Sequence, residues 1–130
     1  MINISIFASG NGSNAENIIK YFNNHDFIRV KQIITNNPDA YVIQRAKFFN
    51  IPSIVINKKE LNNEEYISEK LKKDEIDYIV LAGFLLLIPS FLVKQYQKKI
   101  INIHPALLPK YGGKGMYGEH VHKSVIENKE

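Results

Sequence analysis

The chain has 130 residues, of which 45% are hydrophobic and 23% are charged, enough for one domain with a core and too few for two. It contains no cysteine, which excludes disulfides and thiolate metal ligands, and no apolar run of the length that a membrane-spanning helix needs. The formal net charge of +4 comes from lysines interleaved with carboxylates, a pattern typical of solvated helix faces and not of a nucleic-acid surface.

The amino-terminal residues predict where in the cell the protein is located. The chain begins with Met1 and passes directly into an apolar strand pattern, without the basic and apolar segments of a secretory leader. We therefore expect a cytoplasmic protein.

Apolar runs and amphipathic stretches alternate from end to end. In chain order the pattern predicts strand 2–7, helix 15–22, strand 30–34, helix 41–49, strand 53–56, helix 64–73, strand 78–81, helix 89–96, strand 100–103 and a last helix over about 119–128. Near-continuous apolar strands separated by helices are typical of parallel strands buried on both faces. The sequence therefore predicts an α/β fold, a doubly wound and mostly parallel sheet with helices on both faces, in a single domain over residues 1–130.

The start of the first predicted helix carries a capping signal. Ser13 and Glu16 have the Ser-x-x-Glu spacing of a capping box, in which the hydroxyl and the carboxylate each satisfy a backbone amide of the first turn. This spacing predicts that the helix begins just after Gly12.

The loop after the first strand, residues 10–14, has the sequence Gly-Asn-Gly-Ser-Asn. It lacks the spacing of a Walker loop and the third glycine of a dinucleotide fingerprint, so it favours a phosphate monoester over a nucleoside triphosphate or NAD. The backbone amides of Gly12, Ser13 and Asn14, together with the helix dipole, would face such an anion. An ordinary strand-to-helix turn with a serine cap explains the same residues.

Two polar side chains follow each other at the end of the last predicted strand. Asn102 and His104 lie two residues apart, so on an extended backbone they share one face while Ile103 points into the core. An amide can donate to an oxyanion that develops on a carbonyl carbon, and an imidazole can move the proton of an attacking amine, which suits acyl or formyl transfer. A capped strand end with a half-exposed histidine is the alternative.

Two further features are weaker. His120 and His122 lie two residues apart on a predicted helix and so point to different sides, which disfavours a metal site there. Residues 78–88 form an apolar run that Gly83 interrupts, which fits either a pocket lining or a core strand with its loop.

Three separate motifs carry a family resemblance. They are Phe-Ala-Ser-Gly-Asn-Gly-Ser-Asn at 7–14, Val-Leu-Ala-Gly-Phe at 80–84 and Asn-Ile-His-Pro-Ala-Leu-Leu-Pro-Lys-Tyr at 102–111. In this order and at these intervals they resemble the phosphoribosylglycinamide formyltransferase family, the folate-dependent enzymes of purine synthesis. The resemblance spans essentially the whole chain and implies a Rossmann-like formyltransferase fold.

The resemblance also implies two binding segments. The residues that would bind the phosphate of the small-molecule substrate, phosphoribosylglycinamide, are Gly12, Ser13 and Asn14. The residues that would form the cleft for the pterin of the formyl donor, 10-formyltetrahydrofolate, are Leu85, Leu86, Leu87 and Ile88.

The catalytic roles implied by the resemblance fall on the last motif. His104 would transfer the proton, and Asn102 would contact the formyl oxygen of the folate and steady the tetrahedral intermediate as the substrate amine attacks. No metal and no covalent enzyme intermediate is implied. Lys110 and Lys114 receive no role.

The family pattern continues beyond the last predicted helix, with further strands and a catalytic aspartate that pairs with the histidine. This chain ends at Glu130, so we expect an N-terminal portion of the domain, with activity severely reduced or abolished. The strand at 100–103 would then be an uncovered apolar edge, and we expect homodimerisation or aggregation through it.

Other functions remain open on the sequence. The chain fits an inactive phosphoribosyl-binding fragment that needs a complementing chain. It also fits a formyltetrahydrofolate deformylase, in which water replaces the amine, or a methionyl-tRNA formyltransferase, which the lack of a concentrated basic patch disfavours.

Overall fold

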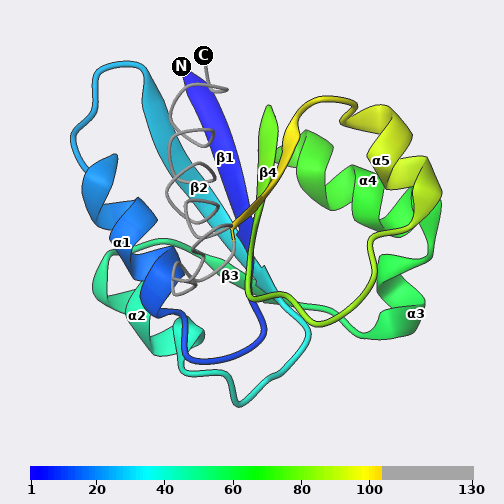
Figure 1. Cartoon of the computed structure of the whole chain (residues 1–130), viewed down its shortest axis with the longest axis horizontal. Helices are drawn as coiled ribbons and strands as arrows, with labels where there is room; N and C mark the ends of the chain where they lie inside the picture. The colour runs from blue at the N-terminus through cyan, green and yellow to red at the C-terminus, as the bar shows by residue number, and fades with distance from the viewer. Residues whose placement is uncertain (104–130) are drawn as a thin grey trace, which may run out of the picture.

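The structure is a computed structural model that describes residues 1–103, and these build one parallel sheet between two layers of helices (Figure 1). The strands are β1 (Ile2–Phe7), β2 (Ile28–Thr35), β3 (Ser53–Val55), β4 (Tyr78–Ala82) and β5 (Ile100–Ile103). The helices are α1 (Ser13–Tyr21), α2 (Val42–Phe48), α3 (Lys58–Leu61), α4 (Glu64–Lys73) and α5 (Ser90–Gln95). The strand order is β3-β2-β1-β4-β5, and every neighbouring pair is parallel.

The helices divide between the two faces of the sheet. Figure 1 shows α1 and α2 together on one side and α3, α4 and α5 on the other. Two separate core clusters reflect this division, because buried residues of α1 and α2 belong to one and buried residues of α3, α4 and α5 belong to the other. The predicted doubly wound α/β sheet is therefore confirmed.

Burial on both faces explains the apolar character of the strands. In β2, Ile33 belongs to the cluster under α1 and α2, whereas its neighbour Ile34 belongs to the cluster under α3 to α5. In β4, Ile79 and Val80 divide in the same way. Since successive side chains alternate between faces, a strand covered on both sides has no position that favours a polar residue.

Three polar side chains are nevertheless buried on the α4 face, and they form one connected network. Ser5 Oγ donates to Gln32 Oε1 at 2.7 Å, and Gln32 Nε2 donates to Asp74 Oδ2 at 2.7 Å. Asn3 Nδ2 donates to the carbonyl oxygens of Asp74 and Glu75, at 3.3 and 3.1 Å. Because each buried group has a partner, the network avoids the cost of a buried polar atom left unpaired. It ties the C-terminus of α4 to β1 and β2.

The predicted elements agree with the structure, with differences at their ends. The helix at 64–73 and the strand at 100–103 have the predicted bounds, and β2 begins at Ile28, two residues earlier than predicted. The short helix α3 was not predicted. It begins with a reciprocal capping box, in which Asn57 and Glu60 each accept from the other's backbone amide. The helix predicted over 119–128 lies outside the described residues.

The capping box predicted at Ser13 and Glu16 is wrong. Gly12 is the N-cap of α1, with φ 81° and ψ 17°, and it has no side chain with which to accept a hydrogen bond. Ser13 is consequently already inside the first turn. The Glu16 carboxylate instead pairs with Arg45 and Lys20.

Among residues 1–103, no helix is both long enough and apolar enough to cross a membrane.

Candidate active site

The centre of the sheet is a topological switch point. β1 and β4 are neighbours, yet the chain leaves β1 toward α1 on one face and leaves β4 toward α5 on the other. Open α/β sheets bind ligands at the carboxyl ends of strands where two such connections diverge. The loop at 10–14 and the segment at 84–88, both singled out in the sequence, follow these two strands.

The loop at 10–14 opens helix α1 as predicted. The first helical bond runs from the Glu16 amide to the Gly12 carbonyl at 2.8 Å. The amides of Ser13 and Asn14 precede that bond, so the helix itself supplies no acceptor for them. Gly12, Ser13 and Asn14 thus place backbone donors and the positive end of the α1 dipole at the carboxyl edge of the sheet.

Gly12 has a packing role that the sequence did not reveal. A Cβ atom built on Gly12 would lie 2.5 Å from Cγ2 of Val42 and 2.9 Å from its Cα, so only glycine lets the loop approach α2 this closely. The Val42 amide also donates to the Gly10 carbonyl at 3.1 Å. The glycine is therefore required by the contact between the loop and α2, independently of any ligand.

Arg45 holds the same loop from α2. Its Nε donates to the Asn11 carbonyl at 2.7 Å, its Nη2 donates to Asn11 Oδ1 at 2.6 Å, and its Nη1 pairs with Glu16. The Arg45 guanidinium, and then the Lys20 ammonium, lower the pKa of the Glu16 carboxyl. Sequence reasoning missed Arg45, because nothing in the spacing of α2 signals a contact with a residue 34 positions earlier.

The segment after β4 presents two surfaces. Leu85 and Leu87 are 80% and 90% exposed, whereas Leu86 and Ile88 are half-buried and pack with Phe84 against the cluster under α3 to α5. The four residues predicted to bind the pterin therefore do not line one surface. Leu86 and Ile88 anchor the segment to the core. Leu85 and Leu87 leave large apolar side chains in solvent, a feature typical of binding surfaces.

Asn102 lies on the sheet face that this segment covers. It pairs with Leu81 of β4 and is exposed, while Ile101 and Ile103 on either side are buried in the opposite cluster. This agrees with the predicted alternation at the end of β5. His104, which the sequence pairs with Asn102, lies outside the described residues, as do Lys110, Lys114, His120 and His122.

Ser9 joins the two loops and was also missed. The Ser9 amide donates to the Gly83 carbonyl at 3.2 Å, and Ser9 Oγ accepts from the Leu85 amide at 2.8 Å. Ser9 Oγ also donates to Asn36 Oδ1. The partners of this buried serine lie 27 and 76 residues away, so no local pattern identifies them.

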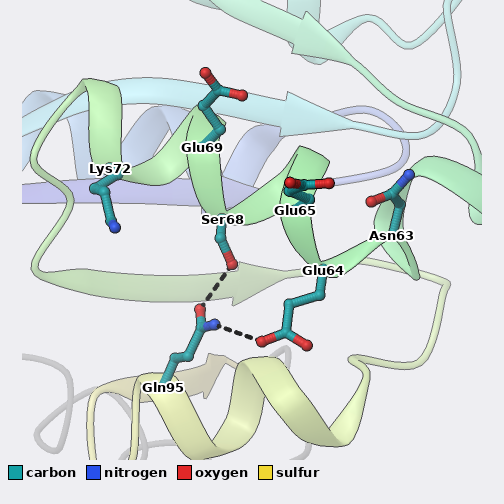
Figure 2. A pocket seen from close by; sticks show the side chains of 7 residues that line it. All are labelled: Asn63, Glu64, Glu65, Ser68, Glu69, Lys72 and Gln95. Carbon is teal, nitrogen blue, oxygen red and sulfur yellow. Dashed lines mark hydrogen bonds between the residues drawn. The ribbon is translucent and has the colours of Figure 1, made fainter.

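A hollow of about 870 Å³ lies away from these loops, between α4 and α5. Figure 2 shows Glu64 and Ser68 turned toward Gln95, while Glu69 points away. Gln95 accepts from Ser68 Oγ at 3.1 Å and donates to Glu64 at 3.4 Å, so these three polar side chains of the hollow bind one another. Within residues 1–103 no group of three His, Cys, Asp or Glu side chains could hold a metal ion.

Three glycines of these loops separate the loss of stability caused by a strained backbone from the loss caused by a steric clash. Gly12 combines φ +81° with the Val42 contact, Gly83 has φ +76° and open space, and Gly10 has neither restriction. We expect Gly12→Ala to lower the free energy of unfolding by roughly 3 kcal/mol or more, Gly83→Ala by about 1 kcal/mol and Gly10→Ala by less than about 0.5 kcal/mol. Urea denaturation measures the free energy of unfolding of all three variants. Equal losses of stability would contradict the contact with Val42.

The pairing of Glu16 predicts a pH dependence. Because its pKa is lowered in the folded protein, the carboxylate stabilises the fold above its ordinary value of 4.5, and this stabilisation is lost as the pH falls through the lowered value. We expect Glu16→Gln to melt below the wild type near neutral pH and to converge with it in acid. Glu65→Gln, which removes an exposed carboxylate of α4, controls for the loss of charge. A melting difference that persists unchanged into acid would contradict the pairing.

Comparison with known proteins places this geometry in a family. The family model described as formyl transferase matches residues 2–129. The chain is 38% identical to the chloroplastic phosphoribosylglycinamide formyltransferase of Arabidopsis thaliana, with 96% of this chain and 45% of the relative covered. It is 39% identical to the Bacillus subtilis phosphoribosylglycinamide formyltransferase, with 92% of this chain and 64% of the relative covered. The chain thus spans about half to two thirds of the length of these relatives.

Solved structures agree. The crystal structure of glycinamide ribonucleotide transformylase 1 from Geobacillus kaustophilus superposes with a TM-score of 0.74 at 37% identity, covering 95% of this chain and 68% of that one. The phosphoribosylglycinamide formyltransferase of Anaplasma phagocytophilum gives a TM-score of 0.73 at 35% identity, covering 95% and 58%. Because the family model matches nearly the whole length and the fold agrees with it, the chain belongs to the formyl transferase family.

Proposed function

We propose that the protein transfers a formyl group from 10-formyltetrahydrofolate to the amine of phosphoribosylglycinamide, in a single formyltransferase domain of which residues 1–130 are the N-terminal part. The observation that carries the proposal is the meeting of two family motifs at the switch point, where the loop at 10–14 and the segment at 84–88 follow neighbouring strands. The names of the similar proteins support the same substrate. The cytoplasm is the proposed location.

The phosphate of the acceptor is assigned to the start of α1. Backbone amides of Gly12, Ser13 and Asn14 would donate to its oxygens, and the α1 dipole would favour its charge. Arg45 is already engaged by Asn11 and Glu16, so its role is to hold the loop in shape.

The formyl donor is assigned to the segment after β4. The exposed side chains of Leu85 and Leu87 offer apolar contact to the pterin, while Leu86 and Ile88 fix the segment to the core. Asn102 lies on the same face of the sheet, next to Leu81. This arrangement supports a formyl group held between the segment and the end of β5.

The chemistry needs a hydrogen-bond donor and a proton carrier. The amine lone pair attacks the formyl carbon, and the carbonyl electrons move onto oxygen, where the Asn102 amide donates a hydrogen bond. His104 takes the proton that leaves the amine and returns a proton to the departing folate nitrogen as the carbon–nitrogen bond breaks. The products are the formylated amide and tetrahydrofolate.

An absorbance assay for tetrahydrofolate release tests the proposal. The chain is assayed alone and with the C-terminal part of the Bacillus subtilis relative. We expect little or no release from the chain alone and, with the added part, release that requires phosphoribosylglycinamide. Release that continues without this acceptor would indicate a deformylase-like hydrolase instead. Ligand-induced thermal stabilisation without release in either arm would indicate a phosphoribosyl-binding fragment.

Asn102→Ala tests the role of the amide. Loss of one oxyanion donor lowers kcat by roughly 100-fold or more. Asn23→Ala is the matched control, because Asn23 is exposed beyond the C-terminus of α1, at the opposite edge of the sheet, and kcat should stay within about twofold. Equal kcat values for the two variants would remove Asn102 from the mechanism.

Association of copies through β5 is also part of the proposal. Within residues 1–103 this strand pairs with β4 alone, and edge strands favour pairing with another chain. A single monomeric species in sedimentation at micromolar concentration would contradict it.

A further inference from the structure

Ser9 occupies the point where the two sides of the site meet. It lies two residues after the end of β1, is 4% exposed, and immediately precedes the loop at 10–14. Its amide donates to Gly83 and its hydroxyl accepts from Leu85, so two of its three hydrogen bonds reach the chain just after β4. The third, from Oγ to Asn36 Oδ1, reaches the chain just after β2.

The hydroxyl is used in both directions. Oγ accepts a hydrogen bond from the Leu85 amide at 2.8 Å and donates one to Asn36 Oδ1, so the hydroxyl hydrogen has a single orientation. Alanine removes both bonds and leaves the Leu85 amide without this acceptor. The position therefore requires a small side chain that donates and accepts at once.

The joined segments belong to opposite layers. The chain passes from Ser9 into α1 on one face, and from Leu85 toward α5 on the other. Gly83 turns with φ +76° and a Cβ there would meet nothing within 4 Å, so no steric contact at Gly83 itself sets the direction in which the segment leaves β4. The hydrogen bonds of Ser9 to Gly83 and Leu85 hold the start of the segment, and the packing of Leu86 and Ile88 holds the rest of it.

The far side of the loop is fixed by α2. Val42 donates to the Gly10 carbonyl, and Arg45 donates to both oxygens of Asn11. With Ser9 held at its other end, the loop is clamped from both layers of the fold.

We infer that Ser9 is a positioning residue that couples the phosphate loop, residues 10–14, to the folate segment, residues 84–88. The inference rests on the proposed function for the identity of the two ligands. Because Ser9 is bonded to both segments, a ligand that holds either segment in its bound position also holds the other, and the second ligand meets a segment that is already positioned. The two ligands consequently bind with positive cooperativity that depends on the Ser9 hydroxyl.

The test compares Ser9→Ala with Ser5→Ala. Ser5 is the matched control because it is also buried and its hydroxyl donates to a β2 side chain 27 residues away, at 2.7 Å, but in the middle of the sheet. Affinities for phosphoribosylglycinamide and for tetrahydrofolate are measured by calorimetry, each alone and with the other saturating. Exchange of the Leu85 amide hydrogen is followed by NMR without ligand.

We expect each ligand to raise the affinity of the other about fivefold or more in the wild type and in Ser5→Ala, and by less than about twofold in Ser9→Ala. The Leu85 amide should exchange about tenfold faster in Ser9→Ala only. If Ser9→Ala does not fold, Asn36→Ala takes its place, because it removes the hydrogen bond from Ser9 Oγ to the residue after β2. A loss of coupling in that variant supports the inference.

The outcomes separate the inference from the function on which it rests. Wild-type protein that binds neither ligand would overturn the proposed function, and the inference with it. Full coupling in Ser9→Ala, with both ligands bound, would overturn the inference and leave the function standing. Unchanged Leu85 exchange in Ser9→Ala would overturn the clamp without reference to any ligand.

Discussion

The parallel pairing of β1 with β4 is the constraint on which the site depends. These strands lie far apart in the sequence, and their pairing brings the Gly-Asn-Gly-Ser-Asn loop to the start of the segment that follows β4. Because the chain then turns to opposite faces, the two connections open away from each other. Both binding functions that we propose follow from this one adjacency, and Ser9 bonds the two connections where they separate.

Much of the architecture was predictable because it is encoded locally. Apolar runs covered on both faces and amphipathic helices follow from side-chain periodicity, and the predicted bounds of α4 and β5 agree with the structure. The helix begins just after Gly12 as predicted, but the capping box at Ser13 failed because the N-cap is Gly12, which has a left-handed backbone and packs against Val42. A motif of four residues cannot report a contact with another helix.

The site was predictable only in part, for the same reason. The loop at 10–14 carries its signal in its own glycines and in the helix that follows. Ser9 and Arg45 carry none, because their partners are distant in sequence and neither residue type is unusual at its position. The four apolar residues after β4 were predicted as one pterin-binding set, but alternation of side chains sends Leu86 and Ile88 inward, which composition alone does not reveal.

The central claim is that the acceptor's phosphate binds at the opening of α1. An NMR titration of the wild-type chain with phosphoribosylglycinamide, with inorganic phosphate as a reference, tests it most directly. We predict that the largest amide shifts fall on Gly12, Ser13 and Asn14, with smaller shifts carried through Ser9 to Leu85. Shifts confined to the opposite edge of the sheet, at residues such as Asn23 and Asn50, would contradict the account.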